Sequence, residues 1–176
     1  MTDLSYVVLT AVGPDHPGLV DSVTRFVYDN GGNLEDSRMV NLHGQFAMIL
    51  LVAGTAATVR KLEAGLPALQ EDAGVHAQLQ PATAKPPPAA ALPLRITAWA
   101  MDHPGLMQSV SHLLASLDVN IESAETSLSS APHTGTPLFS MQLLVSVPVT
   151  MHVSQVREEL GRLCDELNID WSLAPL

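Results

Sequence analysis

One five-residue segment, Asp-His-Pro-Gly-Leu, occurs twice in the chain, and this repeat constrains the fold more than any other feature. The segment lies at residues 15–19 and returns 87 positions later at residues 102–106. Two further pairs of segments share that offset: Leu9-Thr10-Ala11 with Ile96-Thr97-Ala98, and Asn33-Leu34-Glu35 with Asn120-Ile121-Glu122. Several equivalent segments at one constant spacing indicate a single structural unit that is written twice.

With such a repeat, the 176 residues are expected to form two domains of about 80 residues each. We predict an N-terminal domain over residues 1–80 and a C-terminal domain over residues 94–176. The segment 81–93 between them holds five of the thirteen prolines and no apolar alternation, which is typical of an extended linker. Phe46-Ala47-Met48 matches Phe139-Ser140-Met141 at a spacing of 93, so the second copy has six extra residues in a loop within 129–138. The role of this loop, at 130–137, remains open.

Apolar periodicity predicts the same order of elements in both copies. In the first copy, strands are expected at 4–12, 33–42, 45–53 and 75–79. Two helices are expected between them, the first with Pro17 at its first position and Gly31-Gly32 after its end, and the second kinked or restarted at Pro67. In the second copy, the corresponding strands are 94–100, 120–128, 138–147 and 169–173, with helices over 106–117 and 153–167.

The order is therefore βαββαβ in each copy. This pattern predicts an α+β protein of two ferredoxin-like domains, each with a four-stranded antiparallel sheet and two helices on one face.

The net charge argues against binding to polyanions. The formal charge is −10, and residues 1–80 and 81–176 each contain four basic and nine acidic residues. Phosphate backbones and anionic membranes attract Lys and Arg, so we expect neither direct nucleic-acid binding nor membrane binding. The N-terminus lacks a basic region, and its apolar run from Tyr6 to Val12 is too short for a signal peptide or a membrane span. The sequence predicts a cytoplasmic protein.

No catalytic, cofactor or metal site is predicted. The single cysteine, Cys164, lies on the apolar face of a predicted helix and is expected to be buried and inert. Ser109, His112 and Asp118 share one helix and its end without a nucleophile elbow, so they do not indicate a hydrolase. An Asp and a His in each repeated turn are too few ligands for a metal ion. We expect a protein that is not an enzyme and needs no cofactor.

The repeated Asp stands beside a helix start, which is a natural site for an anion. The first amide groups of a helix have no intrahelical partner and attract negative groups. A free amino acid carries both a carboxylate, which suits these amides, and an ammonium group, which suits the carboxylate of Asp15 or Asp102. The alternative, that each Asp only caps its helix, remains open at this point.

The succession of a strand, Asp-x-Pro-Gly-Leu, a helix and Asn-Leu-Glu or Asn-Ile-Glu resembles the ACT domain, a regulatory module that binds amino acids. In ligand-binding ACT domains, contacts come from the residue three before the Gly, from the following backbone and from the start of the second strand. The pocket typically lies where two ACT units meet side by side. The resemblance therefore implies two sets of effector-binding residues: Asp15, Gly18, Leu19 and Asn33; and Asp102, Gly105, Leu106 and Asn120. His16 and His103 are further candidates because they adjoin the two carboxylates.

A segment of the second copy carries a closer resemblance. Residues 130–141, Ser-Ala-Pro-His-Thr-Gly-Thr-Pro-Leu-Phe-Ser-Met, followed by Val147-Pro148, resemble the glycine cleavage system transcriptional repressor family. The resemblance implies a tandem ACT protein that restrains a DNA-binding activator when glycine is scarce, through protein contact and without binding DNA itself. The alternative is an ACT-fold interaction module that regulates an enzyme or has lost ligand binding. The amino acid, the partner and the oligomeric state, with a homo-oligomer among the alternatives, stay open.

Overall fold

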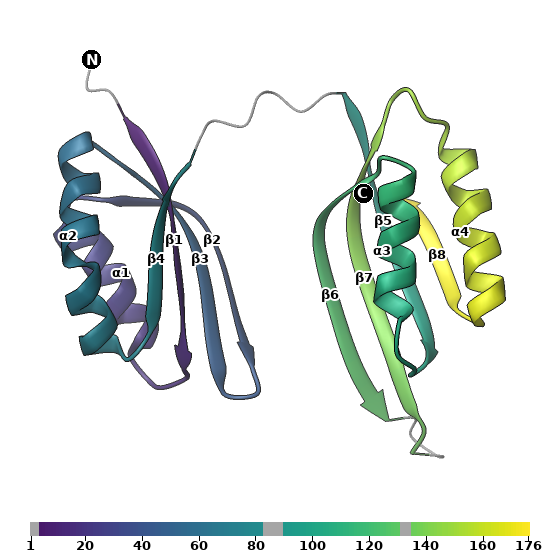
Figure 1. Ribbon diagram of the computed structural model, residues 1–176, viewed down its shortest axis with the longest axis horizontal. Coiled ribbons are helices and arrows are strands. Elements are labelled where there is room, and N and C mark those ends of the chain that lie inside the picture. The colour runs from purple at the N-terminus through teal and green to yellow at the C-terminus, as the bar shows by residue number, and fades with distance from the viewer. Residues whose placement is uncertain (1–3, 83–89, 131–134) are drawn as a thin grey trace. The chain divides into compact units, whose positions relative to one another are not determined.

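The computed structural model of the chain describes residues 4–82, 90–130 and 135–176 (Figure 1). The chain divides into two compact units, Met1–Pro86 and Pro87–Leu176, and both have the element order βαββαβ. The first unit contains β1 (Ser5–Pro14), α1 (Leu19–Asp29), β2 (Asn33–Leu42), β3 (Gln45–Gly54), α2 (Ala56–Ala73) and β4 (His76–Pro81). The second contains β5 (Ala91–Met101), α3 (Leu106–Ser116), β6 (Asn120–Ser130), β7 (Pro137–Pro148), α4 (Val153–Leu167) and β8 (Asp170–Pro175).

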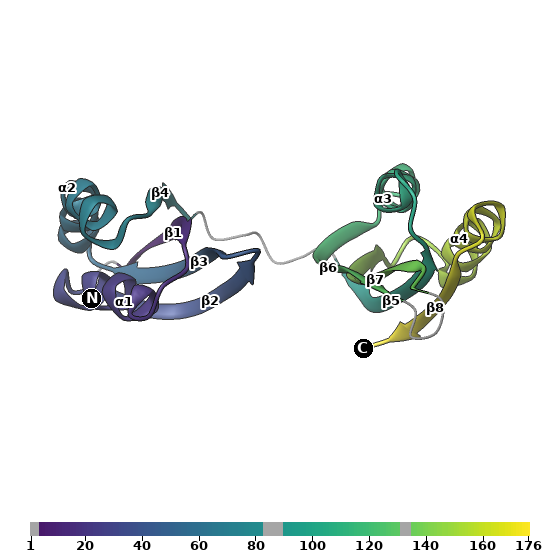
Figure 2. The ribbon, with the colours of Figure 1, turned by 90° about the horizontal axis from the view of Figure 1, so that it is seen from below.

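Each unit is built on one four-stranded antiparallel sheet. The strand orders are β2-β3-β1-β4 and β6-β7-β5-β8, so β2 and β6 are edge strands in equivalent places. Figure 2 shows α3 and α4 on the same side of the second sheet, which leaves the opposite face open. The fold class expected from the sequence, two ferredoxin-like α+β domains, is confirmed.

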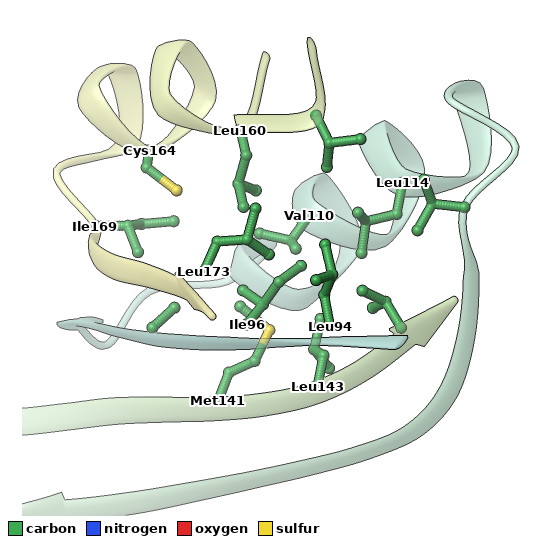
Figure 3. Packing of buried hydrophobic residues seen from close by; sticks show 14 of the residues in the cluster. Leu94, Ile96, Val110, Leu114, Met141, Leu143, Leu160, Cys164, Ile169 and Leu173 are labelled. Atoms are coloured by element: carbon green, nitrogen blue, oxygen red, sulfur yellow. The ribbon is translucent and has the colours of Figure 1, made fainter. Parts of the chain in front are cut away.

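Period-two alternation along the central strands creates the two cores. In β5, Leu94, Ile96, Ala98 and Ala100 are buried, whereas Arg95 and Trp99, which alternate with them, face the open side. Figure 3 shows how Val110 and Leu114 of α3 and Leu160 and Cys164 of α4 close over this face. Burying a Val or Leu side chain of this kind contributes about 1.5–3 kcal/mol. The first unit repeats the pattern with Val7, Leu9 and Ala11 in β1, Val23 and Val27 in α1, and Leu62 and Leu69 in α2.

Pro67 does not divide α2. The helix runs without interruption from Ala56 to Ala73, so the restart that the sequence suggested is wrong. Proline removes one backbone N–H from the helical ladder. Leu62 and Leu69 lie on either side of it and are both buried, so packing on the sheet keeps the two halves in one helix.

The strands next to the linker are longer than expected. Pro81 is the last residue of β4, and β5 begins at Ala91 rather than at Leu94. Since β8 pairs with β5 only from Leu94 onward, Pro93 lies where β5 has a strand neighbour on one side alone. A sheet accepts proline in such a setting. The middle of the predicted linker, 83–89, and residues 131–134 of the enlarged loop lie outside the described residues. Among the helices of the described segments, none has the length and apolar character needed to cross a membrane.

Candidate functional site

The turn between the first strand and the first helix has the same backbone in both units. Gly18 has φ 92° and ψ −5°, and Gly105 has φ 100° and ψ −9°. Proline followed by a glycine with positive φ is typical of a type II turn, and in the first unit the Leu19 N–H closes it by donating to the His16 carbonyl at 3.2 Å. The helix begins at Leu19, after the glycine. Pro17 therefore belongs to the turn, and its expected place as the first helical residue is wrong.

In the first unit, the carboxylate of this turn is already engaged. Asn41, at the end of β2, donates from Nδ2 to Asp15 Oδ2 at 2.6 Å. The Asp15 amide in turn donates to the Gly44 carbonyl at 2.8 Å, and the Gly44 amide donates to Asn41 Oδ1 at 3.2 Å. Asp15 thus ties the turn to the β2–β3 hairpin, which contains Gly44.

The equivalent carboxylate of the second unit has a different environment. The Asp102 amide donates to the Pro137 carbonyl at 3.0 Å, so the backbone link to the hairpin is kept. The residue 87 positions after Asn41 is Leu128, which offers no hydrogen bond. Within the described segments, the Asp102 carboxylate has no hydrogen-bond or ion-pair partner. It is therefore available to a cationic group such as an ammonium.

The two histidines also differ. The Nδ1 atom of His16 lies 3.1 Å from the Pro17 carbonyl oxygen, and its Nε2 atom lies 3.3 Å from the carbonyl oxygen of Ala73, the last residue of α2. These two carbonyl contacts, in that order, raise the pKa of His16 above its ordinary value, and Asp15 adds to the effect. In the second unit, His103 Nδ1 lies 3.2 Å from the Pro104 carbonyl oxygen.

The asparagines that open the second strands sit beside β-bulges. Strand pairing shifts register between Leu34 and Asp36 in β2, and between Ile121 and Ser123 in β6. Asn33 Nδ2 donates to Glu35 Oε1 at 2.9 Å, and Asn120 Nδ2 donates to Glu122 Oε1 at 2.7 Å. The repeated Asn-x-Glu segment therefore encodes a bulge whose extra residue is held by its own asparagine.

Asn33 and Asp15 lie at opposite ends of the first unit. Asn33 pairs with Ala53, which pairs with Tyr6 near the start of β1, whereas Asp15 follows the last residue of β1. The eight steps along the strand from Tyr6 to Pro14 span about 26 Å. Figure 1 shows the same separation, with the β1–α1 turn at the hairpin end of the sheet. The second unit has the equivalent register, so neither unit alone brings its Asp and its Asn together.

Asn33 instead lines a hollow of about 210 Å3 at the far end of α1. Tyr28, Gly32 and Leu34 share this hollow, which the sequence pattern did not predict. Tyr28 is exposed and lies off the apolar stripe of α1. An aromatic residue outside that stripe is the sequence feature that could have indicated this hollow.

The remaining candidate chemistry stays limited. Cys164 is buried, and burial, followed by the nearby Asp165, raises the pKa of its thiol to about 11, so it is not a ready nucleophile. Within the described residues, no three His, Cys, Asp or Glu side chains gather as metal ligands would. What the turns offer is carboxylates and helix-start amides, groups that bind rather than react.

Comparison with known proteins agrees with this architecture. The family model of the ACT domain matches residues 5–80, which is the first unit. A UPF0237 protein of Methanococcus maripaludis is 34% identical over 76 residues, covering 42% of this chain and 84% of the relative. The chain belongs to the ACT-domain family.

Other relatives of this ACT-domain protein match both units together. The glycine cleavage system transcriptional repressor of Escherichia coli (strain K12) is 27% identical over 172 residues, covering 96% of this chain and 88% of the relative. The solved structure of an unknown protein from Galdieria sulphuraria has a TM-score of 0.81 and 27% identity, covering 99% of both chains. The expected resemblance is confirmed: the chain is a tandem ACT protein of the regulatory type and not an enzyme.

Proposed function

We propose that the chain binds a small amino acid, glycine or a similar one, and controls a DNA-binding transcriptional activator through protein contact. Similarity over nearly the whole chain to a transcriptional repressor of the glycine cleavage system supports the regulatory part of this proposal. The acidic surface supports an indirect route, since a net charge of −10 repels DNA phosphates. A regulator of such an activator acts where the activator acts, and we infer a cytoplasmic location.

The open carboxylate of Asp102 is the observation that carries the effector half. It stands beside the start of α3, where Gly105 has positive φ and where no side chain caps the helix. The first helical amides, from Leu106 to Gln108, have no backbone acceptor in the described part of the chain. An ammonium group on Asp102 and a carboxylate on these amides would satisfy both ends of one amino acid.

Asn33 and Asn120 lie too far from the aspartates of their own units to contact the same small amino acid. Each lies about one sheet length from the Asp of its own unit, a distance of about 26 Å that no small amino acid spans. Neither asparagine therefore joins the contacts that we propose around the Asp of its own unit.

The alternative, an interaction module without a ligand, is favoured by a specific observation in the first unit. There Asn41 holds the Asp15 carboxylate, and the Leu19 amide already donates to His16. The Asp15 carboxylate and the first helical amide are therefore both engaged within the protein. We propose that the second unit senses the effector, with Asp102, Gly105 and Leu106 in contact, and that the first unit is structural at Asp15, Gly18, Leu19 and His16.

Thermal unfolding with a panel of amino acids tests the sensor proposal. A ligand at 100 times its Kd stabilises the folded chain by about 2.7 kcal/mol, which is visible as a rise in Tm. We expect glycine, or another small amino acid such as serine, to produce the rise. A flat response to the full panel would leave the interaction module as the better description.

A mobility-shift assay tests the indirect route. Purified protein is expected to leave duplex DNA unshifted at physiological salt. Tight, salt-sensitive binding to DNA would contradict the charge argument.

A further inference from the structure

The open face of the second sheet carries a hollow that the proposed effector site does not use. Its volume is about 270 Å3, and it is lined by Thr97, Trp99, Glu125, Thr126, Ser127, Ser140, Met141 and Gln142. Trp99 is 50% exposed, although tryptophan usually buries most of its ring. A half-exposed indole beside a carboxylate needs an explanation.

Strand register places the lining residues in two rows across the face. Thr97 pairs with Gln142, which pairs with Glu125; in the next row, Trp99 pairs with Ser140, which pairs with Ser127. On its other side, Trp99 pairs with Asp170 of β8. The indole is therefore flanked by a carboxylate on the neighbouring strand and faces a second one across the hollow.

The hydroxyl groups of Thr97, Ser127 and Ser140 make hydrogen bonds within the sheet, whereas the Glu125 carboxylate does not. Thr97 Oγ1 lies 2.6 Å from Ser172 Oγ, and Ser127 Oγ lies 2.7 Å from Ser140 Oγ. Over the residues that the structure describes, Glu125 makes no hydrogen bond or ion pair. The groups that can meet a ligand therefore include the aromatic face of Trp99 and the negative charge of Glu125.

We propose that this hollow binds an arginine side chain from an extended segment of the protein partner. A guanidinium group stacks flat on an indole face and donates two parallel hydrogen bonds to a carboxylate. The hollow lies next to β6, an edge strand, beside which an extended segment can run. A net charge of −10 favours a basic partner. This inference rests on the protein-contact half of the proposed function.

The first unit has the same fold but lacks the aromatic and acidic side chains of this hollow. The positions equivalent to Trp99, Glu125 and Asp170 in the first sheet are Val12, Arg38 and His76, as the strand pairings require. Arg38 donates to Asp36 at 2.7 Å. The first unit thus has no aromatic face here and carries the opposite charge, and it supplies a matched control.

Nuclear magnetic resonance on the 15N-labelled full chain tests the proposal. The probe is a capped pentapeptide, Gly-Gly-Arg-Gly-Gly, and the control peptide has norleucine in place of arginine. We expect the arginine peptide to shift the Trp99 Nε1–H and the amides of Ser127 and Gln142 in a saturable way. Trp171 pairs with the buried Ala98 and packs against the core, away from the hollow. Its indole N–H therefore serves as the reference signal.

Two variants separate binding from folding. Glu125→Gln keeps the shape of an exposed side chain and should raise the peptide Kd about two- to fivefold. Arg38→Gln, at the equivalent position of the first unit, should leave the Kd unchanged. Equal shifts with the norleucine peptide, no saturable shift around Trp99, or an unchanged Kd in Glu125→Gln would each overturn the inference. The amino-acid rise in Tm, measured on the same samples, reports on the sensor proposal separately.

Discussion

The Asp-His-Pro-Gly turns of the two units share one sequence and one backbone geometry, but their neighbours differ. Asp15 accepts a hydrogen bond from Asn41, and His16 contacts the end of α2. The second unit has Leu128 at the position of Asn41, and the Asp102 carboxylate has no partner in the described part of the chain. The local motif determines the path of the backbone, whereas a residue far along the chain decides whether the carboxylate is structural or available.

Hairpin length underlies part of this difference. In the first unit, β2 and β3 are joined by His43 and Gly44 alone, with φ 51° and 78°, as a type I′ turn requires. This tight turn sets the Gly44 carbonyl against the Asp15 amide. In the second unit six residues, 131–136, connect the two strands instead of two, and Pro137 takes over the backbone contact. The longer hairpin thus keeps the backbone link, while Leu128 in place of Asn41 removes the side-chain amide.

The largest predicted difference between the turns is in the effector response. With a responsive amino acid at 100 times its Kd, the wild type gains about 2.7 kcal/mol, and Asp102→Asn is expected to lose most of that gain. Asp15→Asn should keep it, because Asp15 is engaged by Asn41. Thermal unfolding with and without the amino acid measures both. Equal losses in the two variants would remove the functional distinction between the turns.

A second prediction concerns the backbone that the turns share. Gly18→Ala and Gly105→Ala should each destabilise their unit by about 1–2 kcal/mol, because left-handed backbone is unfavourable for a residue with a Cβ. An added Cβ would meet no atom within 4 Å at either position, so the cost comes from the backbone alone. Urea unfolding measures it. Both tryptophans, Trp99 and Trp171, belong to the second unit, so their fluorescence reports that unit, and hydrogen exchange reports the first. Clearly unequal costs would show that the turns differ in backbone as well.

The fold was predictable from the sequence because its signals are local. The apolar alternation along Val7, Leu9 and Ala11 can be seen within a few residues, and so can the three- and four-residue spacing in the helices. Both patterns occur in each copy of the repeat, so each copy supports the prediction for the other. The departures are places where packing or a distant residue intervenes. α2 continues through Pro67 because Leu62 and Leu69 are both anchored in the core.

The candidate site was less predictable because it depends on register and long-range partners. The motif indicated which residues are special, but not that Asn33 lies a sheet length from Asp15. Asn41 is 26 positions from Asp15, and nothing in the local pattern pairs them. The Leu19 amide was expected to face a ligand, whereas in the folded turn it donates to His16.

A third prediction measures the contact that distinguishes the first turn. Asp15→Ala and Asn41→Ala, alone and combined, form a double-mutant cycle whose coupling free energy should be about 0.5–1.5 kcal/mol. The value is modest because both side chains are exposed. The matched cycle with Asp102→Ala and Leu128→Ala should give coupling near zero. Coupling of the same size in both units would show that the carboxylates are not held differently.

The smallest predicted effect is a pH dependence that belongs to the first turn alone. Both ring nitrogens of His16 lie near carbonyl oxygens, those of Pro17 and Ala73, so the imidazolium can donate from both and its pKa is raised above 6.5. Ala73 ends α2, whose last turn contains no basic residue, and a positive charge there also suits the helix dipole.

Because the pKa of His16 is higher in the folded state, its contribution to stability is complete below pH 6.5 and is lost as the pH rises through the folded value. The unfolding midpoint of the first unit in urea should therefore fall slightly between about pH 6 and pH 8, and His16→Asn should flatten this fall. His103→Asn is the matched control and should leave the slope of the first unit unchanged, since His103 lies in the other unit. Direct titration of the His16 ring by nuclear magnetic resonance gives an independent check. A midpoint at or below 6.5 would mean that the contact with Ala73 does not hold the proton.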